Sequence, residues 1–269
     1  SFTKGVTNMQ YKFFLSPAMF TEKEKLLANE AHLTKSLLST GLHALRKADI
    51  EHIGLFYQAF FSLSIGLERM LKIIMIMRFR VENDGSFPEN HELKKCGHNL
   101  EKLLKEIGIA SFNNVISDSI ISFLNDFAQK DRYYNFDSLT IAEHNKDNPL
   151  TKWNQIQNII LETYPRKTIS DQYLYAAKLL DQCSSVYFYD LNGNSVDSVE
   201  KLVLNQYDCE YVQGYAVWHL FEIIKSLHKR IRSLEQKKYF MPVISEFFDF
   251  YTDYWSRSEI RKKKNWMNI

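Results

Sequence analysis

An arginine and a histidine close together in the chain could bind and cleave a phosphodiester. Arg46 is followed six positions later by His52, in the segment RKADIEH. An arginine can hold a phosphate, and a histidine can exchange protons with a ribose 2′-hydroxyl near neutral pH. The two residues are therefore a candidate catalytic pair. In the structural alternative, Arg46 complements the C-terminal dipole of one helix and His52 lies in the first turn of the next.

A second candidate site is the segment DRYYNFD, which places Arg132 beside aromatic, amide and carboxylate side chains. In one interpretation Tyr134 packs a loop against the protein, while Asn135 and Asp137 make the hydrogen bonds of a turn. In the other, Arg132, Tyr134, Asn135 and Asp137 bind a phosphate or the chain of a protein partner. The nearest downstream histidine, His144, is a more distant candidate for a catalytic proton acceptor.

The C-terminal segment is a third candidate, because it gathers positive charge beside Trp266. Its cations are Arg261, Lys262, Lys263 and Lys264. Such a run can bind RNA by neutralising phosphates and stacking a base, but cations also complement a helix C-terminus without binding anything. A second basic strip runs from Lys225 to Lys238. If the two strips converge on one face of the protein, RNA binding is favoured.

Other kinds of chemistry find little support. The chain has no Gly-rich phosphate loop, no GxSxG and no HExxH motif. Its three cysteines, Cys96, Cys183 and Cys209, are far apart in the sequence and form no CxxC pair. We therefore predict that they are reduced thiols that are buried or half-buried. Asp249 and Asp253 are one helical turn apart, as surface carboxylates often are. We therefore predict no metal site and no cofactor.

Charge and hydropathy restrict the remaining classes. The formal net charge is +2, so a nucleic-acid site must be local rather than global. The most apolar stretch, residues 70–77, contains Lys72 and is far shorter than the roughly 20 residues of a membrane span. The N-terminal residues lack the apolar core of a secretory signal. These features predict a cytoplasmic protein that does not cross a membrane.

The elements that must position these residues are predicted to be mainly helices, because the chain has only 9 glycines and 5 prolines among 269 residues. Thr21 and Glu24 have the spacing of a capping box ahead of a helix that ends near residue 47. Asp49 is the expected N-cap of a very apolar helix at about 50–80, which should be the most buried element and antiparallel to the first. We also expect Asn99 to cap a helix and His98 to make a local hydrogen bond.

The rest of the chain divides into shorter segments. Helices are expected at 113–130, 150–163, 168–184 and 209–236, and from Pro242 through the basic segment. Residues 131–149 are expected to form a long ordered loop or the boundary between two domains. Asn192 and Gly193 favour the tight turn of a small β-hairpin near 186–198. The prediction is an all-α protein with one hairpin, in which an aromatic stripe at 247–255 packs in the core or in a dimer.

Three segments in this order resemble the HEPN superfamily of helical bundles. They are an aromatic-rich helix that carries Gly66, Glu68 and Lys72, the segment GHNLEKLLKEIG at 97–108, and DRYYNFDSL. The resemblance covers about residues 20–140. It implies a HEPN-like bundle at 1–145 and a C-terminal helical lobe at 146–269 that packs against it. It also implies a homodimer, and a setting in prokaryotic defence or toxin–antitoxin pairs with a partner such as a nucleotidyltransferase.

The resemblance also bears on activity. HEPN ribonucleases carry an arginine followed four to six residues later by a histidine near the start of the last bundle helix. Arg132 stands at that place, but no histidine follows at this spacing. Related domains without the histidine keep Arg-Tyr here, so binding of RNA, a nucleotide or a partner protein is the favoured function. The alternatives are a divergent metal-independent endoribonuclease that uses His52 or His144, and a helical scaffold unrelated to nucleic acid.

Overall fold

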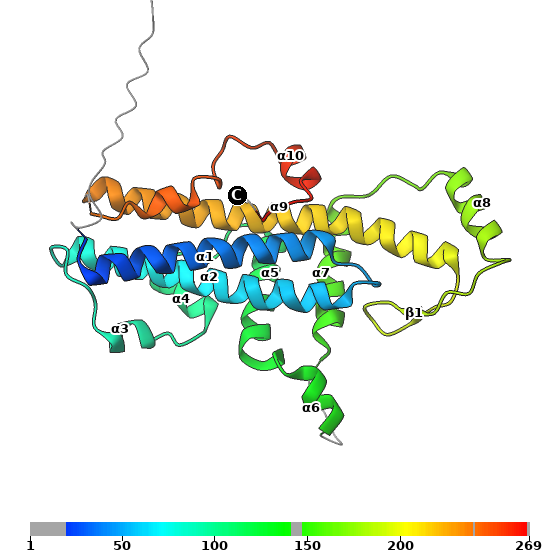
Figure 1. The fold of residues 1–269 in the computed structure, drawn as a ribbon, viewed down its shortest axis with the longest axis horizontal. Helices are drawn as coiled ribbons and strands as arrows, with labels where there is room; N and C mark the ends of the chain where they lie inside the picture. Colours follow the sequence, from blue (N-terminus) through cyan, green and yellow to red (C-terminus); the bar gives the residue numbers. More distant parts are fainter. Residues whose placement is uncertain (1–19, 141–146, 239, 268–269) are drawn as a thin grey trace, which may run out of the picture.

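The computed structural model describes residues 20–140, 147–238 and 240–267. The fold is all-α with one two-stranded hairpin, as predicted. Helices α1 (Glu22–Lys47) and α2 (Ile53–Glu82) form a long antiparallel pair (Figure 1). Phe60, Leu63, Leu67 and Leu71 of α2 are each at most 1% exposed, so the prediction of a deeply buried central helix is confirmed.

Local signals explain where these two helices begin. Thr21 and Glu24 form the predicted capping box at the start of α1. Asp49 does not cap α2, because the N-cap position is His52, which makes no side-chain cap. The Asp49 carboxylate instead accepts hydrogen bonds from the backbone N–H groups of Glu51 and His52, so it stabilises the turn between the helices.

Glycines allow α1 and α2 to approach closely. A Cβ atom on Gly41 would lie 2.5 Å from Cγ of Leu63, and one on Gly66 would lie 2.9 Å from Cδ2 of Leu38. These distances are shorter than real Cβ contacts, so larger residues at either position would push the helices apart.

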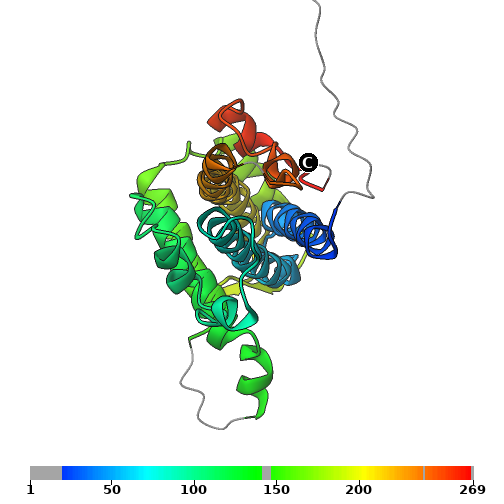
Figure 2. The same cartoon turned by 90° about the vertical axis from the view of Figure 1, so that its left-hand side faces the viewer.

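A third long helix, α9 (Val199–Lys237), packs against both α1 and α2 and completes a three-helix core (Figures 1 and 2). It begins ten residues earlier than expected, at a cap formed by Ser198. Residues of the second half of the chain therefore help to cover the apolar surface of α2.

Shorter helices line one side of this core (Figure 2). They are α3 (Asn90–Lys94), α4 (Leu100–Glu106), α5 (Val115–Asp126), a π-helical turn (Phe127–Asp131), α6 (Tyr134–Thr140) and α7 (Pro149–Thr163). Aromatic rings join the layers, since the Phe60 ring lies 4.6 Å from that of Phe123 and 5.2 Å from that of Trp153 between ring centroids.

Two expected segments differ from the structure. Residues 134–140 form α6 rather than a loop, and no continuous helix follows Pro242. The chain there makes a 3-10 turn (Ile244–Phe248) and a separate helix α10 (Arg257–Lys262), with Ser256 and Glu259 as a capping box. The Phe248, Tyr251 and Trp266 side chains of this segment are all buried in the core.

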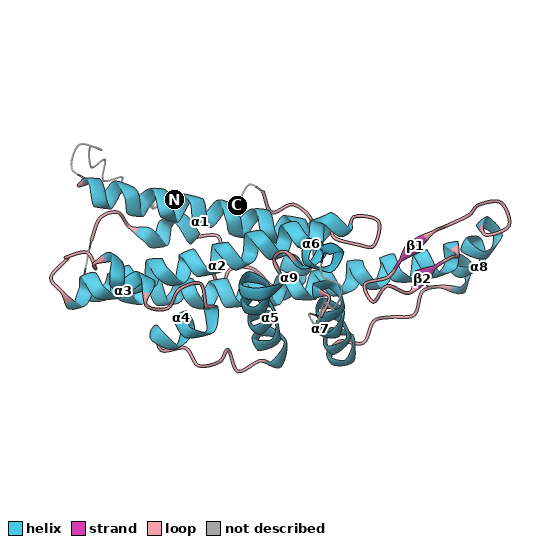
Figure 3. Cartoon of the chain, turned by 90° about the horizontal axis from the view of Figure 1, so that it is seen from below, coloured by secondary structure: helices cyan, strands magenta, loops and turns pink. Residues whose placement is uncertain are grey.

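The far end of the molecule carries α8 (Asp171–Leu180) and the hairpin strands β1 (Phe188–Tyr189) and β2 (Ser195–Val196) (Figure 3). The strands are antiparallel, with Phe188 opposite Val196. The predicted hairpin is thus confirmed. In the part of the chain that the structure describes, no helix is both long and apolar enough to cross a membrane.

Candidate functional site

A charged pair lies in the middle of the mostly apolar helix α2. Glu68 and Lys72 are one turn apart, and the Lys72 ammonium donates a hydrogen bond to the Glu68 carboxylate at 2.7 Å. The side chains are 12% and 26% exposed, so the pair is largely withdrawn from water. Burying charge has a free-energy cost, so a half-buried pair on a core helix indicates a second task for these groups.

The Glu68 carboxylate also holds a histidine from another element. Nδ1 of His98 lies 2.9 Å and 3.1 Å from the two Glu68 oxygens. His98 therefore makes a contact over 30 positions of sequence, and the prediction of a local hydrogen bond is wrong. Because a carboxylate only accepts, Nδ1 carries the hydrogen and Nε2 of the neutral ring is left as an acceptor.

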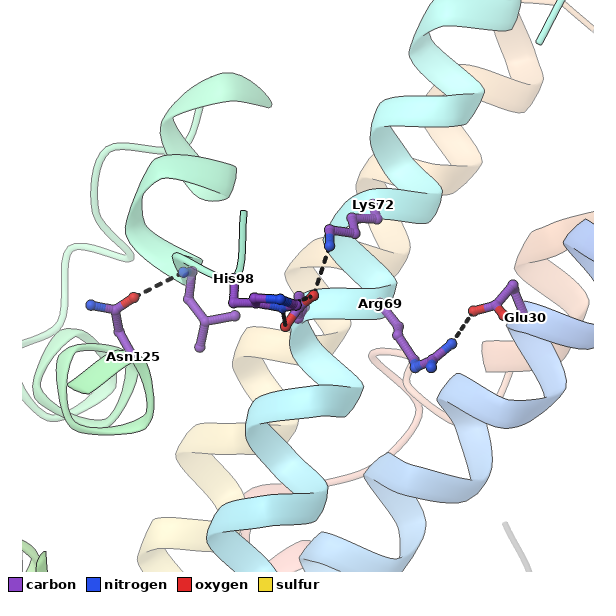
Figure 4. A network of polar contacts seen from close by, with 7 residues as sticks. Glu30, Arg69, Lys72, His98 and Asn125 are labelled. Carbon is purple, nitrogen blue, oxygen red and sulfur yellow. Dashed lines mark hydrogen bonds and ion pairs between the residues drawn. The ribbon is translucent and has the colours of Figure 1, made fainter. Parts of the chain in front are cut away.

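The turn before α4 positions His98. Gly97 has a φ of +57°, a conformation that favours glycine, and Asn99 caps α4 by accepting from the N–H of Lys102 at 2.8 Å, as predicted. Next to it, the Leu100 N–H donates to the Asn125 side chain of α5 at 2.9 Å (Figure 4). The start of α4 is therefore fixed to α5, which holds the imidazole against α2.

Arg132 approaches the same place from the π-helical turn. A π turn inserts one residue relative to an α-helix and so changes the direction of the side chains that follow it. The Arg132 guanidinium lies 5.9 Å from the centroid of the Phe61 ring. Its Nε is buried and has no hydrogen-bond partner among the described residues. The neighbouring carboxylate of Asp131 is occupied by Lys152 of α7, at 2.9 Å.

These side chains line one pocket of about 490 Å³. Its polar lining consists of Glu30, Glu68, Arg69, Lys72, His98 and Arg132, and we call it the Arg132 pocket. Arg69 is paired with Glu30 of α1 (Figure 4). Three cations face two carboxylates, which leaves a net charge of +1 with His98 neutral. The pocket is therefore suited to an anion, and a carboxylate-held imidazole lies at its wall.

The other residues of the Arg132 segment have different surroundings. Of Arg132, Tyr134, Asn135 and Asp137, only Arg132 lines the pocket within the described part of the chain. Asn135 accepts a hydrogen bond from the Tyr57 hydroxyl at 3.3 Å, which ties α6 to α2. Burial raises the pKa of that hydroxyl. His144 lies outside the described residues.

The Arg46 and His52 pair has a structural role in this fold. The Arg46 side chain is 6% exposed, lies 3.6 Å from the Glu210 carboxylate, and donates from Nε to the Arg261 carbonyl oxygen at 3.3 Å. Nδ1 of His52 lies 2.8 Å from Asp49. Both residues line a groove of about 510 Å³, so the structure brings them to one surface.

The basic C-terminal segment is not a freely solvated helix end. Helix α10 ends at Lys262, and Trp266 is fully buried. The Lys263 ammonium lies 5.4 Å from the centroid of the Phe250 ring, and Lys264 forms an ion pair with Glu210 at 2.8 Å. These contacts place Arg261 and Lys264 beside Arg46, a convergence that the sequence did not reveal.

The second basic strip is neutralised locally. Lys225 and Lys229 both pair with Asp253, at 3.2 Å and 2.6 Å. Lys238 pairs with Asp84, and Arg230 donates to the Ile107 carbonyl oxygen. These contacts give Lys225, Lys229, Arg230 and Lys238 partners within the fold. Asp253 is held by lysines rather than shared with Asp249 as a metal ligand.

The cysteines differ in their surroundings. Cys96 and Cys209 are buried, whereas Cys183 is exposed, so the prediction of a buried or half-buried thiol is wrong at that position. Burial raises the pKa of the Cys209 thiol to about 12, which keeps it protonated and unreactive.

Comparison of the chain with protein-family models, curated proteins and solved structures finds no match. The relation to the HEPN superfamily therefore stays a prediction.

Among the polar residues of the Arg132 pocket, only Arg132 was chosen as a site residue from the sequence. The others were not chosen, and His98 was expected to make only a local hydrogen bond. A signal for part of the site is the position of Glu68 and Lys72, a charged pair that interrupts a mostly apolar helix.

Proposed function

We propose that the chain is a cytoplasmic, HEPN-like protein that binds RNA by holding a backbone phosphate in the Arg132 pocket. The observation that carries this proposal is the buried Nε of Arg132, which lacks an acceptor among the described residues. A buried donor without a partner costs about 1–3 kcal/mol, and a phosphate oxygen would supply the missing acceptor.

The charges of the pocket support the same ligand. Glu30 and Glu68 neutralise Arg69 and Lys72, so Arg132 supplies the excess positive charge. The pocket opens on the surface beside α4, and its volume of about 490 Å³ is sufficient for a nucleotide. A scaffold unrelated to nucleic acid would not need an unpaired, half-buried guanidinium in such a place.

Binding of fluorescent single-stranded RNA to the Arg132→Gln variant tests the proposal. The variant should bind about tenfold more weakly or worse, because a charge-assisted hydrogen bond contributes roughly 1.5–3 kcal/mol. The slope of log affinity against log salt should fall by about 0.7, the value for one phosphate contact on a single strand. Lys178→Gln, at an exposed lysine of α8 far from the candidate sites, is the control for the loss of one positive charge. Equal binding by both variants would contradict the proposal.

A second candidate function is metal-independent cleavage of RNA. It is favoured by the Glu68 and His98 contact of 2.9 Å, which orients an imidazole with a free Nε2 at the wall of the pocket that holds Arg132. In this mechanism Nε2 accepts the proton of the ribose 2′-hydroxyl, whose oxygen attacks the phosphorus and displaces the 5′-oxygen of the next nucleotide, while Arg132 stabilises the charge that develops on the phosphate. The departing 5′-oxygen takes up a proton from water, and the other product carries a 2′,3′-cyclic phosphate. His98 would thus replace the histidine missing after Arg132.

Cleavage of RNA in the presence of EDTA distinguishes the two functions. If the protein cleaves, His98→Gln should abolish cleavage with little loss of binding, whereas His52→Gln should leave cleavage unchanged. If wild type binds RNA without cleaving it, the binding function stands alone. Loss of cleavage in the His52 variant, with the fold intact, would instead favour the pair near Arg46.

The partners implied by the resemblance belong to the same proposal. A homodimer would need an exposed apolar surface, and Tyr133 just before α6 together with Phe136 and Leu139 of α6 are 64%, 70% and 83% exposed. Light scattering at micromolar concentration should give twice the 31.8 kDa of one chain. Co-purification with the product of a neighbouring nucleotidyltransferase gene would test the defence or toxin–antitoxin setting.

A further inference from the structure

A groove far from the Arg132 pocket concentrates unbalanced positive charge. It consists of two adjoining hollows of about 510 Å³ and 300 Å³ that share Arg46, Glu210 and Lys264, and we call it the tail groove. Five cations and two carboxylates line the two hollows, a net charge of +3 with His52 neutral. That charge is local, because the whole chain carries only +2.

One carboxylate is shared by two cations in this groove. Glu210 pairs with Lys264 at 2.8 Å and lies 3.6 Å from Arg46, which is too long for a good hydrogen bond. The Lys264 hydrogen bond lowers the pKa of Glu210, so the carboxylate is ionised near neutral pH and is already engaged. Burial lowers the pKa of Arg46, and the nearby charge of Arg261 acts in the same direction.

Arg261 carries a buried donor that lacks an acceptor. Its Nε is buried without a hydrogen-bond partner among the described residues, and its guanidinium stacks 3.6 Å from the centroid of the Tyr215 ring. The stack restrains the guanidinium, and Arg261 lines the smaller hollow of the groove. Arg46 and Arg261 thus repel one another across a hollow that an anion would stabilise.

Aromatic rings flank the same cations. Tyr207 and Tyr211 line the smaller hollow, and Tyr207 is 38% exposed. Aromatic side chains of this kind provide a stacking surface for a nucleobase, and combined with clustered cations they suit a nucleotide better than a bare phosphate. Hollows of 300–1,000 Å³ are typical of sites for such ligands.

The tail groove is separate from the Arg132 pocket. The pocket reaches α1 at Glu30 and the groove reaches it at Arg46, sixteen residues later. At 1.5 Å of rise per residue the two positions are about 24 Å apart along α1, and the helical rotation places them on roughly opposite faces. One nucleotide bound in either site therefore does not reach the other site.

We propose that the tail groove is a second binding site, for a nucleoside polyphosphate whose phosphates contact Arg46, Arg261 and Lys264 and whose base stacks on Tyr211. A net charge of +3 matches a di- or triphosphate better than a monophosphate. The ligand can be a free nucleotide or the 5′-triphosphate end of an RNA, since both present the same chemistry.

Calorimetric titration of the full chain with ATP, AMP and pyrophosphate, in EDTA, tests this site. We expect ATP to bind at least tenfold more tightly than AMP. Lys264→Gln and Arg261→Gln should each weaken ATP binding about tenfold, whereas Lys105→Gln on the exposed face of α4 should not. Tyr211→Leu should weaken ATP binding but leave pyrophosphate binding unchanged.

The Glu210→Gln variant separates a binding site from a structural cluster. It removes the carboxylate that competes with the ligand, so ATP should bind more tightly, which a damaged fold would not produce. Titration with 5′-triphosphorylated and 5′-hydroxyl RNA distinguishes the two sources of the ligand. No binding of ATP or of the triphosphorylated RNA at millimolar concentration would overturn the proposal, as would unchanged binding in both cation variants. The Arg132→Gln variant should bind ATP as wild type does, so the two sites can fail independently.

Discussion

Neutralising Glu68 should change stability and RNA affinity in opposite directions. The Glu68 carboxylate is 12% exposed and accepts hydrogen bonds from Lys72 at 2.7 Å and from His98 at 2.9 Å. The Glu68→Gln variant keeps the shape of the side chain and one acceptor oxygen but removes the charge. If Glu68 had only a structural role, its replacement would lower both the stability of the protein and its affinity for RNA.

The expected magnitudes follow from exposure and charge. A charge-assisted hydrogen bond contributes roughly 1.5–3 kcal/mol when buried and an exposed ion pair about 0.2–1 kcal/mol. Lys72 is 26% exposed and His98 is 74% exposed, so solvent screens most of the histidine contribution. We expect the free energy of unfolding to fall by about 1–2 kcal/mol. RNA should bind about fivefold more tightly, since one charge about 8 Å away at a dielectric constant of about 40 is equivalent to roughly 1 kcal/mol.

Urea unfolding followed by circular dichroism measures the first effect, and RNA fluorescence anisotropy at low salt measures the second. Glu162→Gln, at an exposed glutamate of α7, controls for the change in net charge. Weaker RNA binding by the Glu68 variant would refute the reasoning. So would tighter binding that Glu162→Gln reproduces in full, because the effect would then belong to the whole chain and not to the pocket.

Three further predictions concern other parts of the molecule. Burial lowers the pKa of His219 to about 4 in the folded protein. As the pH falls from 6.5 to 4, this histidine therefore becomes protonated in the unfolded chain but not in the folded protein. The free energy of unfolding should fall by up to about 3 kcal/mol over this range. Urea unfolding at pH 7.5 and 4.5 measures this fall, which His219→Gln should reduce. Gly41→Ala should destabilise the protein by about 1–3 kcal/mol, because the alanine Cβ would lie 2.5 Å from Cγ of Leu63. An unchanged melting temperature of this variant would contradict the close packing of α1 and α2. Replacing Lys262, Lys263 and Lys264 together by Ala should lower the salt slope of binding to 5′-hydroxyl RNA by about 1, and not by the roughly 2–3 expected if all three lysines contacted phosphates, since Lys263 packs on aromatic rings and Lys264 is paired with Glu210. A fall of 2 or more would show that all three lysines contact phosphates.

Local signals in the sequence were sufficient for most of the helices. The capping box of Thr21 and Glu24, the apolar period of α2 and the turn residues Asn192 and Gly193 each depend on neighbours within about four positions. These local interactions do not depend on tertiary packing, and they are present in the folded protein. They therefore predicted an all-α protein with one hairpin and the pairing of α1 with α2.

The candidate site could be predicted only in part. Arg132 was identified from its residue type and its neighbours, but the segment around it was expected to be a loop. The π-helical turn before it is invisible in the sequence, because one inserted residue preserves the apolar pattern of α5 while changing the direction of Arg132.

Only the tertiary structure decided which polar groups meet. The Glu68 and His98 contact depends on how α4 packs on α5 and α2, and the meeting of Arg46 with Arg261 joins residues 215 positions apart. The free energy that brings these groups together is the burial of apolar side chains such as Trp266, which carries the basic segment back against α1 and α9. The sequence by itself determined the helices and the charges that they carry. Packing determined which of these charges are paired, and it left Arg132 and Arg261 each with a buried donor that has no acceptor among the described residues.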